Sequence, residues 1–156
     1  SAGLGRIHGD VELQARQLLG RVAALAADRN DRVALIGWSL GGILSRAVAR
    51  ERPDLVRRIV TFGTPVAGGP AHTAFGRRYT DDELREIDAL IEARRARPLQ
   101  TPITAIWSRR DGVVAPHACI DDHSANVDHV EVSSTHLGMG IDPDVWAVIA
   151  DRLSRP

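Results

Sequence analysis

The segment 33–53 constrains the fold of this chain more than any other. The short apolar run Val33–Ile36 is rich in β-branched residues and is typical of a buried strand. The sequence Gly37-Trp38-Ser39-Leu40-Gly41 follows at once. Residues 43–52 then form a helical pattern that ends at a proline. We therefore expect Ser39 at a sharp turn from a strand into a helix.

Such a turn holds its central residue in a strained backbone conformation and lifts the side chain clear of the sheet. The pattern Gly-x-Ser-x-Gly alone is weak evidence, because it occurs by chance in many chains. The strand before it and the helix after it favour a nucleophilic serine. We expect both flanking glycines, Gly37 and Gly41, to be required where strand and helix pass close together. The N–H of Leu40 would point at the group that Ser39 attacks.

Length and composition indicate one globular domain over residues 1–156. Hydrophobic residues make up 44% of the 156 residues, which is enough for a real core. The 20 basic and 20 acidic residues cancel, so no basic surplus indicates a nucleic-acid partner. No apolar run is long enough for a transmembrane segment.

The remaining segments alternate between strand and helix patterns. Helices are expected over 11–27, 81–97 and from 142 or 143 to 153, and further strands over 58–62, 102–107 and 127–132. This alternation predicts an α/β fold of three layers, in which helices cover both faces of a mostly parallel sheet of about four strands. Sites in such sheets form at the carboxyl ends of strands. Ser39, Asp111 and His136 each follow the end of an expected strand.

The elbow sequence around Ser39, the turn Asp111-Gly112-Val113-Val114 and the loop Ser134–Gly138 together resemble the α/β-hydrolases, in their lipase and esterase branch. They occur in that family's order of Ser, then Asp, then His. The resemblance implies that Ser39 is the nucleophile, His136 the general base and then acid, and Asp111 the residue that orients His136.

The same resemblance implies further site residues. Leu40 would donate its N–H to the oxyanion, and Val113 and Leu137 would contact the substrate. Trp38, beside the nucleophile, would either line the substrate pocket or merely pack. It implies no cofactor and no metal. Residues 66–98 would form a cap over the site, with an apolar face turned inward that consists of Leu84, Ile87 and Ile91. Ordinary packing of that helix on the sheet is the alternative.

Other candidates for the orienting carboxylate and for the base are weaker by position. Asp121 and Asp122 lie in the middle of a loop, and Asp128 lies in a strand. Among the other histidines, His8 precedes the first helix and His72 lies in the segment 66–98. His117 and His123 lie in the loop after the third strand, and His129 lies within the fourth strand. The acidic and histidine side chains over 117–129 match no tight metal-ligand spacing, so a solvated polar loop is expected there. Cys119 lacks a nucleophile turn and is expected to be a small packed residue.

The chain departs from the family in one large respect. The expected strands match only the second half of the fold. The strand Val33–Gly37 would then be an exposed apolar edge, which a second copy of the chain or a preceding segment would cover. His8-Gly9 resembles the family's second oxyanion element only superficially, because no apolar strand precedes it. The compartment is not determined by the sequence. The absence of a secretion signal favours the cytoplasm, but only weakly, because such a signal would precede the first half of the fold, which the expected strands do not match.

The sequence therefore predicts a serine hydrolase that cleaves carboxylic esters through an acyl-enzyme, with a small ester or acyl compound as its substrate. Two alternatives stay open. One is a thioesterase, amidase or acyltransferase reaction on the same three residues, which the sequence does not separate from ester hydrolysis. The other is a chain that keeps the three residues but acts as a non-catalytic interaction module.

Overall fold

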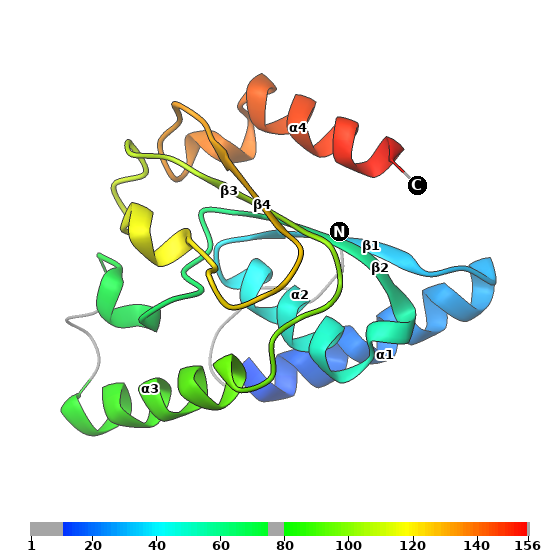
Figure 1. Cartoon of the computed structure of the whole chain (residues 1–156), viewed down its shortest axis with the longest axis horizontal. Coiled ribbons are helices and arrows are strands. Elements are labelled where there is room, and N and C mark those ends of the chain that lie inside the picture. The colour runs from blue at the N-terminus through cyan, green and yellow to red at the C-terminus, as the bar shows by residue number, and fades with distance from the viewer. Residues whose placement is uncertain (1–10, 75–79, 156) are drawn as a thin grey trace.

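The computed structural model describes residues 11–74 and 80–155. Figure 1 shows helices and strands alternating along the chain. The main elements are α1 (Val11–Arg29), β1 (Val33–Trp38), α2 (Leu40–Glu51), β2 (Val56–Phe62), α3 (Asp81–Arg95), β3 (Ile103–Trp107), β4 (Val127–Glu131) and α4 (Pro143–Ser154). Short 3₁₀ turns lie between them: η1 (Pro53–Leu55), η2 (Gly69–His72), η4 (Pro116–Cys119) and η5 (Gly138–Gly140).

The described strands form one sheet in the order β1-β2-β3-β4, and every neighbouring pair is parallel. The prediction of a parallel sheet of four strands is confirmed. All carboxyl ends of these strands lie at the same edge of the sheet. The loops after β1, β3 and β4, which carry Ser39, Asp111 and His136, therefore leave from that edge.

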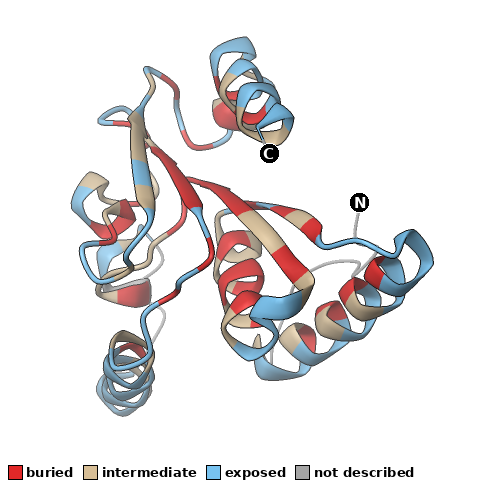
Figure 2. Ribbon diagram, turned by 45° about the vertical axis from the view of Figure 1, so that its right-hand side comes forward, coloured by how far each residue is buried: buried red, intermediate tan, exposed pale blue. Residues whose placement is uncertain are grey.

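Helices cover both faces of the sheet, as predicted. Figure 2 shows α4 on one side of the sheet and α1 with α2 on the other. The core under α1 and α2 contains Leu44, Val48 and Ile59. The core under α4 contains Val60 and Ile149. The result is the expected three-layer arrangement.

Strand β2 is apolar on both faces because it lies between helices. Its neighbouring residues Ile59 and Val60 point to opposite faces and are both fully buried. Strand β1 differs, since it lies at an edge of the described sheet. Ile36 and Trp38 are 42% and 39% exposed, although both are large and apolar. The expected exposed edge is therefore present at β1, and what covers it stays a prediction.

Two helices differ in detail from the sequence-based expectation. Helix α1 extends to Arg29, beyond the expected end at residue 27, and it buries Ala26 while its neighbour Leu25 is 47% exposed. Helix α3 packs on η2. A Cβ at Gly69 would lie 2.8 Å from the Ile91 side chain and 3.0 Å from that of Ile87, so these two residues do share the inner face of α3. Residues 75–79 of the expected cap lie outside the described residues.

None of the helices in the described part of the chain combines the length and the apolarity that crossing a membrane requires.

The central position of β2 gives a matched pair of stability tests. Ile59→Ala removes a fully buried side chain from the middle of the sheet. We expect it to lower the free energy of unfolding by about 2–5 kcal/mol. Ile36→Ala makes the same chemical change at the half-exposed edge strand and should cost less than about 1 kcal/mol. Urea unfolding followed by circular dichroism measures both, and equal losses would contradict the described packing.

Candidate active site

Ser39 forms the junction between β1 and α2 and has a strained backbone. Its φ is 53° and its ψ is −123°, a region that residues with a Cβ seldom adopt. The backbone around it is held by two hydrogen bonds: Ser39 N–H donates to the Phe62 carbonyl at 2.9 Å, and Gly42 N–H donates to the Ser39 carbonyl at 3.0 Å. The Ser39 hydroxyl does not cap α2, so it is available for other contacts.

Close packing at this junction requires glycine at two positions. A Cβ at Gly37 would lie 2.5 Å from the Gly42 Cα, and a Cβ at Gly42 would lie 2.1 Å from the Thr64 Oγ1. Gly41 meets nothing within 4 Å. The expectation that both flanking glycines are required is therefore confirmed for Gly37 and wrong for Gly41. The close contact comes from the next residue, because Gly42 is the one that faces β2.

Asp111 and His136 form a buried pair. Asp111 Oδ2 lies 2.8 Å from His136 Nδ1, and the side chains are 1% and 7% exposed. The other carboxylate oxygen accepts hydrogen bonds from the N–H groups of Val113, at 2.9 Å, and Val114, at 2.6 Å. The backbone N–H of His136 also donates to the backbone carbonyl of Asp111 at 2.9 Å. The carboxylate is thus fixed by its own turn and in turn fixes the imidazole.

The end of β2 brings this pair next to the Ser39 junction. A Cβ at Gly63, whose φ is 54°, would lie 2.9 Å from His136 Nδ1 and 3.1 Å from Asp111 Oδ2. The Trp38 ring, which precedes Ser39, lies 5.6 Å from the His136 ring and stacks on Phe62 at 6.2 Å. Gly63 therefore packs directly against the pair, and only a residue without a Cβ fits there.

The direct bond between serine and histidine is not formed in this structure. Within the described residues, the His136 ring forms a hydrogen bond with Asp111 and none with the Ser39 hydroxyl. Catalytic hydrogen bonds are often long in unliganded enzymes and tighten when substrate binds.

The other site residues expected from the sequence lie around this group. Leu40 is the first residue of α2, so its N–H lies at the positive end of the helix dipole. Val113 is half-buried in the turn after Asp111, and Leu137 is 74% exposed directly after His136. Trp38, Val113 and Leu137 therefore give the surroundings an apolar character.

The loop 117–129 corrects one expectation. Asp121 is buried and not solvated, because it forms an ion pair with Arg46 of α2 and accepts hydrogen bonds from the N–H groups of His123 and Ser124. Burial would raise the pKa of Asp121, but the charge of Arg46 and these hydrogen bonds outweigh it and hold the pKa well below its usual range. The neighbouring Asp122 is exposed, as expected.

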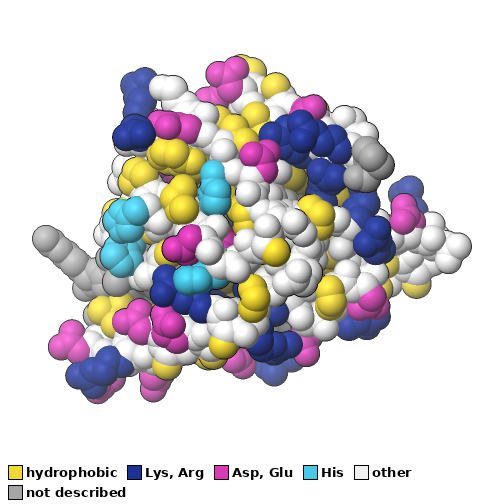
Figure 3. All heavy atoms as spheres, in the orientation of Figure 1, with side chains coloured by type: hydrophobic (Ala, Val, Ile, Leu, Met, Phe, Trp, Pro, Cys, Tyr) yellow, Lys and Arg dark blue, Asp and Glu magenta, His cyan; other side chains and the backbone are white. Residues whose placement is uncertain are grey.

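The remaining histidines have other partners. His72 Nδ1 and His117 Nε2 lie 3.0 Å apart, which joins η2 to η4. The ring of His129 accepts from the Asp121 N–H. His8 and Gly9 lie outside the described residues. On the face seen in Figure 3, histidine side chains lie among hydrophobic and acidic ones. Within the described residues, no group of three or more His, Cys, Asp or Glu side chains could hold a metal ion.

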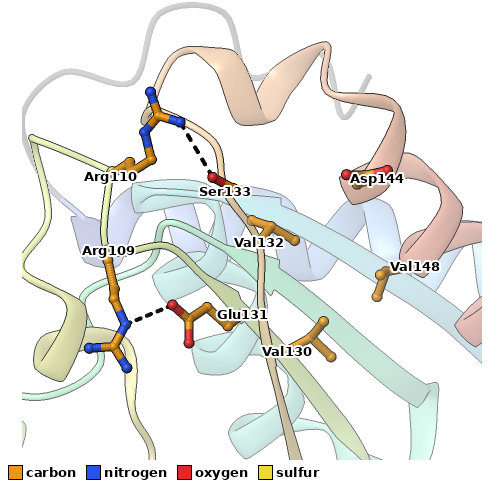
Figure 4. A pocket seen from close by; sticks show the side chains of 8 residues that line it. All are labelled: Arg109, Arg110, Val130, Glu131, Val132, Ser133, Asp144 and Val148. Atoms are coloured by element: carbon orange, nitrogen blue, oxygen red, sulfur yellow. Dashed lines mark hydrogen bonds and ion pairs between the residues drawn. The ribbon is translucent and has the colours of Figure 1, made fainter.

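A hollow of about 640 Å³ lies elsewhere, between β4 and α4. Figure 4 shows three valines in its lining, Val130, Val132 and Val148. Arg109 and Arg110 lie on one side of it. Arg109 pairs there with Glu131, and Arg110 donates to Ser133. None of the residues expected in the site lines this hollow. We therefore place the candidate active site at the junction of β1, β2 and α2 and not in this hollow.

Comparison with known proteins supports the fold. The structure matches one reported for the metagenome-derived lipolytic enzymes LipS and LipT, with a TM-score of 0.69, 19% identity, and coverage of 94% of this chain and 73% of that chain. It matches Aspergillus fumigatus lipase B with a TM-score of 0.73, 18% identity, and coverage of 94% of this chain and 42% of that chain. A Paleococcus ferrophilus monoacylglycerol lipase matches with a TM-score of 0.64, 16% identity, and coverage of 96% of this chain and 75% of that chain.

These matches, together with the order of the sheet, show that the chain has the fold of the α/β-hydrolases, as its sequence motifs predict. A family model described as a PGAP1-like alpha/beta domain matches residues 16–82. That range contains most of α1, the Ser39 junction and β2.

The buried Asp121 gives a stability prediction with an adjacent control. Asp121→Asn leaves Arg46 charged and buried, so we expect a loss of about 3–5 kcal/mol in the free energy of unfolding. Asp122→Asn, at an exposed position, should change it by less than about 0.5 kcal/mol. Because the folded pKa of Asp121 is depressed, its contribution is present above the unfolded value of 3.8 and is lost as the pH falls toward the folded pKa. Urea unfolding from pH 7 to acid should show the two variants converging, and a constant gap would contradict this assignment.

Cys119 gives a chemical test of burial. Its side chain is 3% exposed, and burial together with the charge of Asp111 raises its pKa to about 12. The thiolate is the reactive form, so we expect iodoacetamide at pH 8 to leave the folded protein unmodified. The same reagent in guanidinium should add one group per chain, measured by intact mass. Fast modification of the folded protein would show that Cys119 is accessible.

Proposed function

We propose that this chain is a serine hydrolase that cleaves carboxylic esters through an acyl-enzyme. Ser39 is the nucleophile, His136 the general base and acid, and Asp111 the orienting carboxylate. One observation carries the proposal: the buried pair of Asp111 and His136, 2.8 Å apart, packs against Trp38 and Gly63 beside a serine whose φ is 53°. A strained serine next to an oriented histidine is the arrangement that nucleophilic catalysis requires.

The first step follows from the tautomer of His136. With Asp111 Oδ2 accepting from Nδ1–H, the Nε2 of His136 carries a lone pair and can take the proton of the Ser39 hydroxyl. The serine oxygen then forms a bond to the ester carbonyl carbon, and the carbonyl electron pair moves to its oxygen. The buried carboxylate stabilises the imidazolium that results.

The negative oxygen of the tetrahedral intermediate needs a donor. Leu40 N–H is suited to this role, because it follows the nucleophile and lies at the N-terminus of α2. The intermediate collapses as His136 Nε2–H gives its proton to the leaving alcohol. Water, deprotonated by the same nitrogen, then attacks the acyl group and releases the acid and free Ser39. Every proton in this cycle passes through His136, so side chains and water suffice for the chemistry.

An apolar acyl group suits the surroundings of Ser39. The exposed side chains of Trp38 and Leu137 flank the site, and Val113 lies in the turn that holds Asp111. The names of similar proteins, which include lipolytic enzymes and a monoacylglycerol lipase, support an ester substrate. A thioester, an amide or transfer to another acceptor would use the same acyl-enzyme, so a substrate panel distinguishes these reactions.

We also propose that the whole chain acts as one domain and that residues 66–98 cover the site. The start of this segment is bonded to the loop after Asp111: the Ala74 N–H donates to the Val113 carbonyl, and the Ala115 N–H donates to the His72 carbonyl. Residues that leave the sheet at the end of β2 therefore remain attached to the turn that carries Asp111. A second copy of the chain or a preceding segment is proposed to cover β1.

Labelling with a fluorophosphonate probe tests the function, because the probe reacts with an activated serine. We expect one label per chain at Ser39, located by peptide mass spectrometry. Ser39→Ala should abolish it, and His136→Ala or Asp111→Asn should slow it by at least about 10²-fold. Turnover of ester, thioester and amide substrates with the same acyl group should then be compared with the unlabelled wild-type protein.

The matched controls are Ser133→Ala and His123→Ala, which change exposed residues of the same types. Both should label at the wild-type rate. A folded wild-type chain that takes no label, or a label on another serine, would refute the proposed nucleophile and favour the non-catalytic interpretation.

A further inference from the structure

Thr64 makes an unusual contact with the Ser39 junction. Its side chain is buried just beyond the end of β2, and the residue is 2% exposed. The Thr64 hydroxyl lies 3.0 Å from the Ser39 carbonyl oxygen and 3.3 Å from the Phe62 carbonyl oxygen. A hydroxyl has one proton to donate, and the shorter distance favours donation to Ser39. The bond links residues 25 positions apart in the sequence.

The acceptor of this bond belongs to the peptide unit that joins Ser39 to Leu40. A peptide unit is planar and trans, so its C=O and N–H point in opposite directions. Any group that fixes the direction of the Ser39 carbonyl therefore fixes the direction of the Leu40 N–H as well. That N–H is the proposed donor to the oxyanion. A side chain that never touches the substrate can thus determine where the donor points.

The surroundings leave room for this contact. Any side chain at Gly42 would collide with the Thr64 hydroxyl, since its Cβ would lie 2.1 Å from Oγ1. Gly42 is thus the residue that lets the hydroxyl reach the Ser39 carbonyl. This explains why the tight glycine of the junction is Gly42 and not Gly41.

The Ser39 carbonyl would be less well fixed without Thr64. Its other recorded bond outside the helix ladder comes from Gly42 N–H, three residues along the same turn. That bond moves with the turn itself, whereas Thr64 anchors the peptide to β2 in the middle of the sheet. The ψ of −123° at Ser39 sets the orientation of this same peptide, and it lies in a strained region that needs support from its surroundings.

We propose that Thr64 is a positioning residue that orients the Leu40 N–H toward the oxyanion through its hydrogen bond to the Ser39 carbonyl. The proposal rests on the proposed function, because it assigns a role within that catalytic site. It predicts a loss in the steps that develop negative charge on oxygen, with little change in ground-state binding.

The test compares Thr64→Val, which replaces the hydroxyl with a methyl group of similar size, with Thr64→Ser, which keeps the hydroxyl. Thr104→Val makes the same change at a buried threonine on β3 and serves as the control. Losing an oxyanion donor costs about 10²–10³ in rate, so misorienting one should slow fluorophosphonate labelling of Ser39 by about 10- to 100-fold. Thr64→Ser should recover the rate to within about threefold, and Thr104→Val should leave it unchanged.

A second measurement separates positioning from general damage. A trifluoromethyl ketone adds to the serine and forms an oxyanion, while the matching methyl ketone binds without forming one to the same extent. Thr64→Val should weaken inhibition by the first compound about 10-fold or more and leave the second unchanged. If Thr64→Val does not fold, Thr64→Ala and Thr64→Ser, which differ by the hydroxyl alone, replace it.

Two results would overturn the role of Thr64 while leaving the proposed function intact. One is a wild-type protein labelled at Ser39 together with a Thr64→Val variant labelled equally fast. The other is a loss in Thr64→Val no greater than that in Thr104→Val at a similar drop in melting temperature. A folded wild-type protein without any label would instead overturn the proposed function, and the role of Thr64 with it.

Discussion

The close approach of α2 to the carboxyl end of β2 is the contact on which the rest of the site depends. Gly42 lets the two elements meet, and the Thr64 hydroxyl and the Phe62 carbonyl then hold the backbone of Ser39 from the β2 side. Gly63, which follows Phe62, leaves room for the pair of His136 and Asp111. A central strand is well suited to this task, because it is buried on both faces and cannot shift without disturbing the whole core.

Much of this fold could be predicted from the sequence, for a physical reason. Strands that helices cover on both faces require apolar neighbours such as Ile59 and Val60 of β2, and prolines and glycines end the helices between them. The residues at the carboxyl ends of those strands follow from the parallel order alone. The sequence therefore predicts Asp111 and His136 at one edge of the sheet, although only the family resemblance implies that they pair.

Contacts between distant segments could not be predicted in the same way. Asp121 reads as a loop residue, and nothing near it in the sequence shows that Arg46, 75 positions earlier, neutralises it in the interior. The need for glycine at position 42 comes from Thr64, which lies just beyond the end of β2. Leu25 and Ala26 both fit a helical pattern, and only the direction from which α2 approaches decides which one is buried. Such outcomes depend on three-dimensional packing, which local patterns do not contain.

The excursion between β2 and β3 is closed at its base, and this has a consequence for how proteins of this shape can diversify. Where it leaves the sheet, the N–H groups of Val66 and Ala67 donate to the Ala118 carbonyl, and where it returns, the Leu99 N–H donates to the Ser124 hydroxyl. The chain between these two sets of hydrogen bonds can lengthen at small entropic cost, about 0.6 kcal/mol for each doubling of its length. Insertions there could reshape substrate selection while the reacting groups stay fixed, so specificity and chemistry can evolve separately.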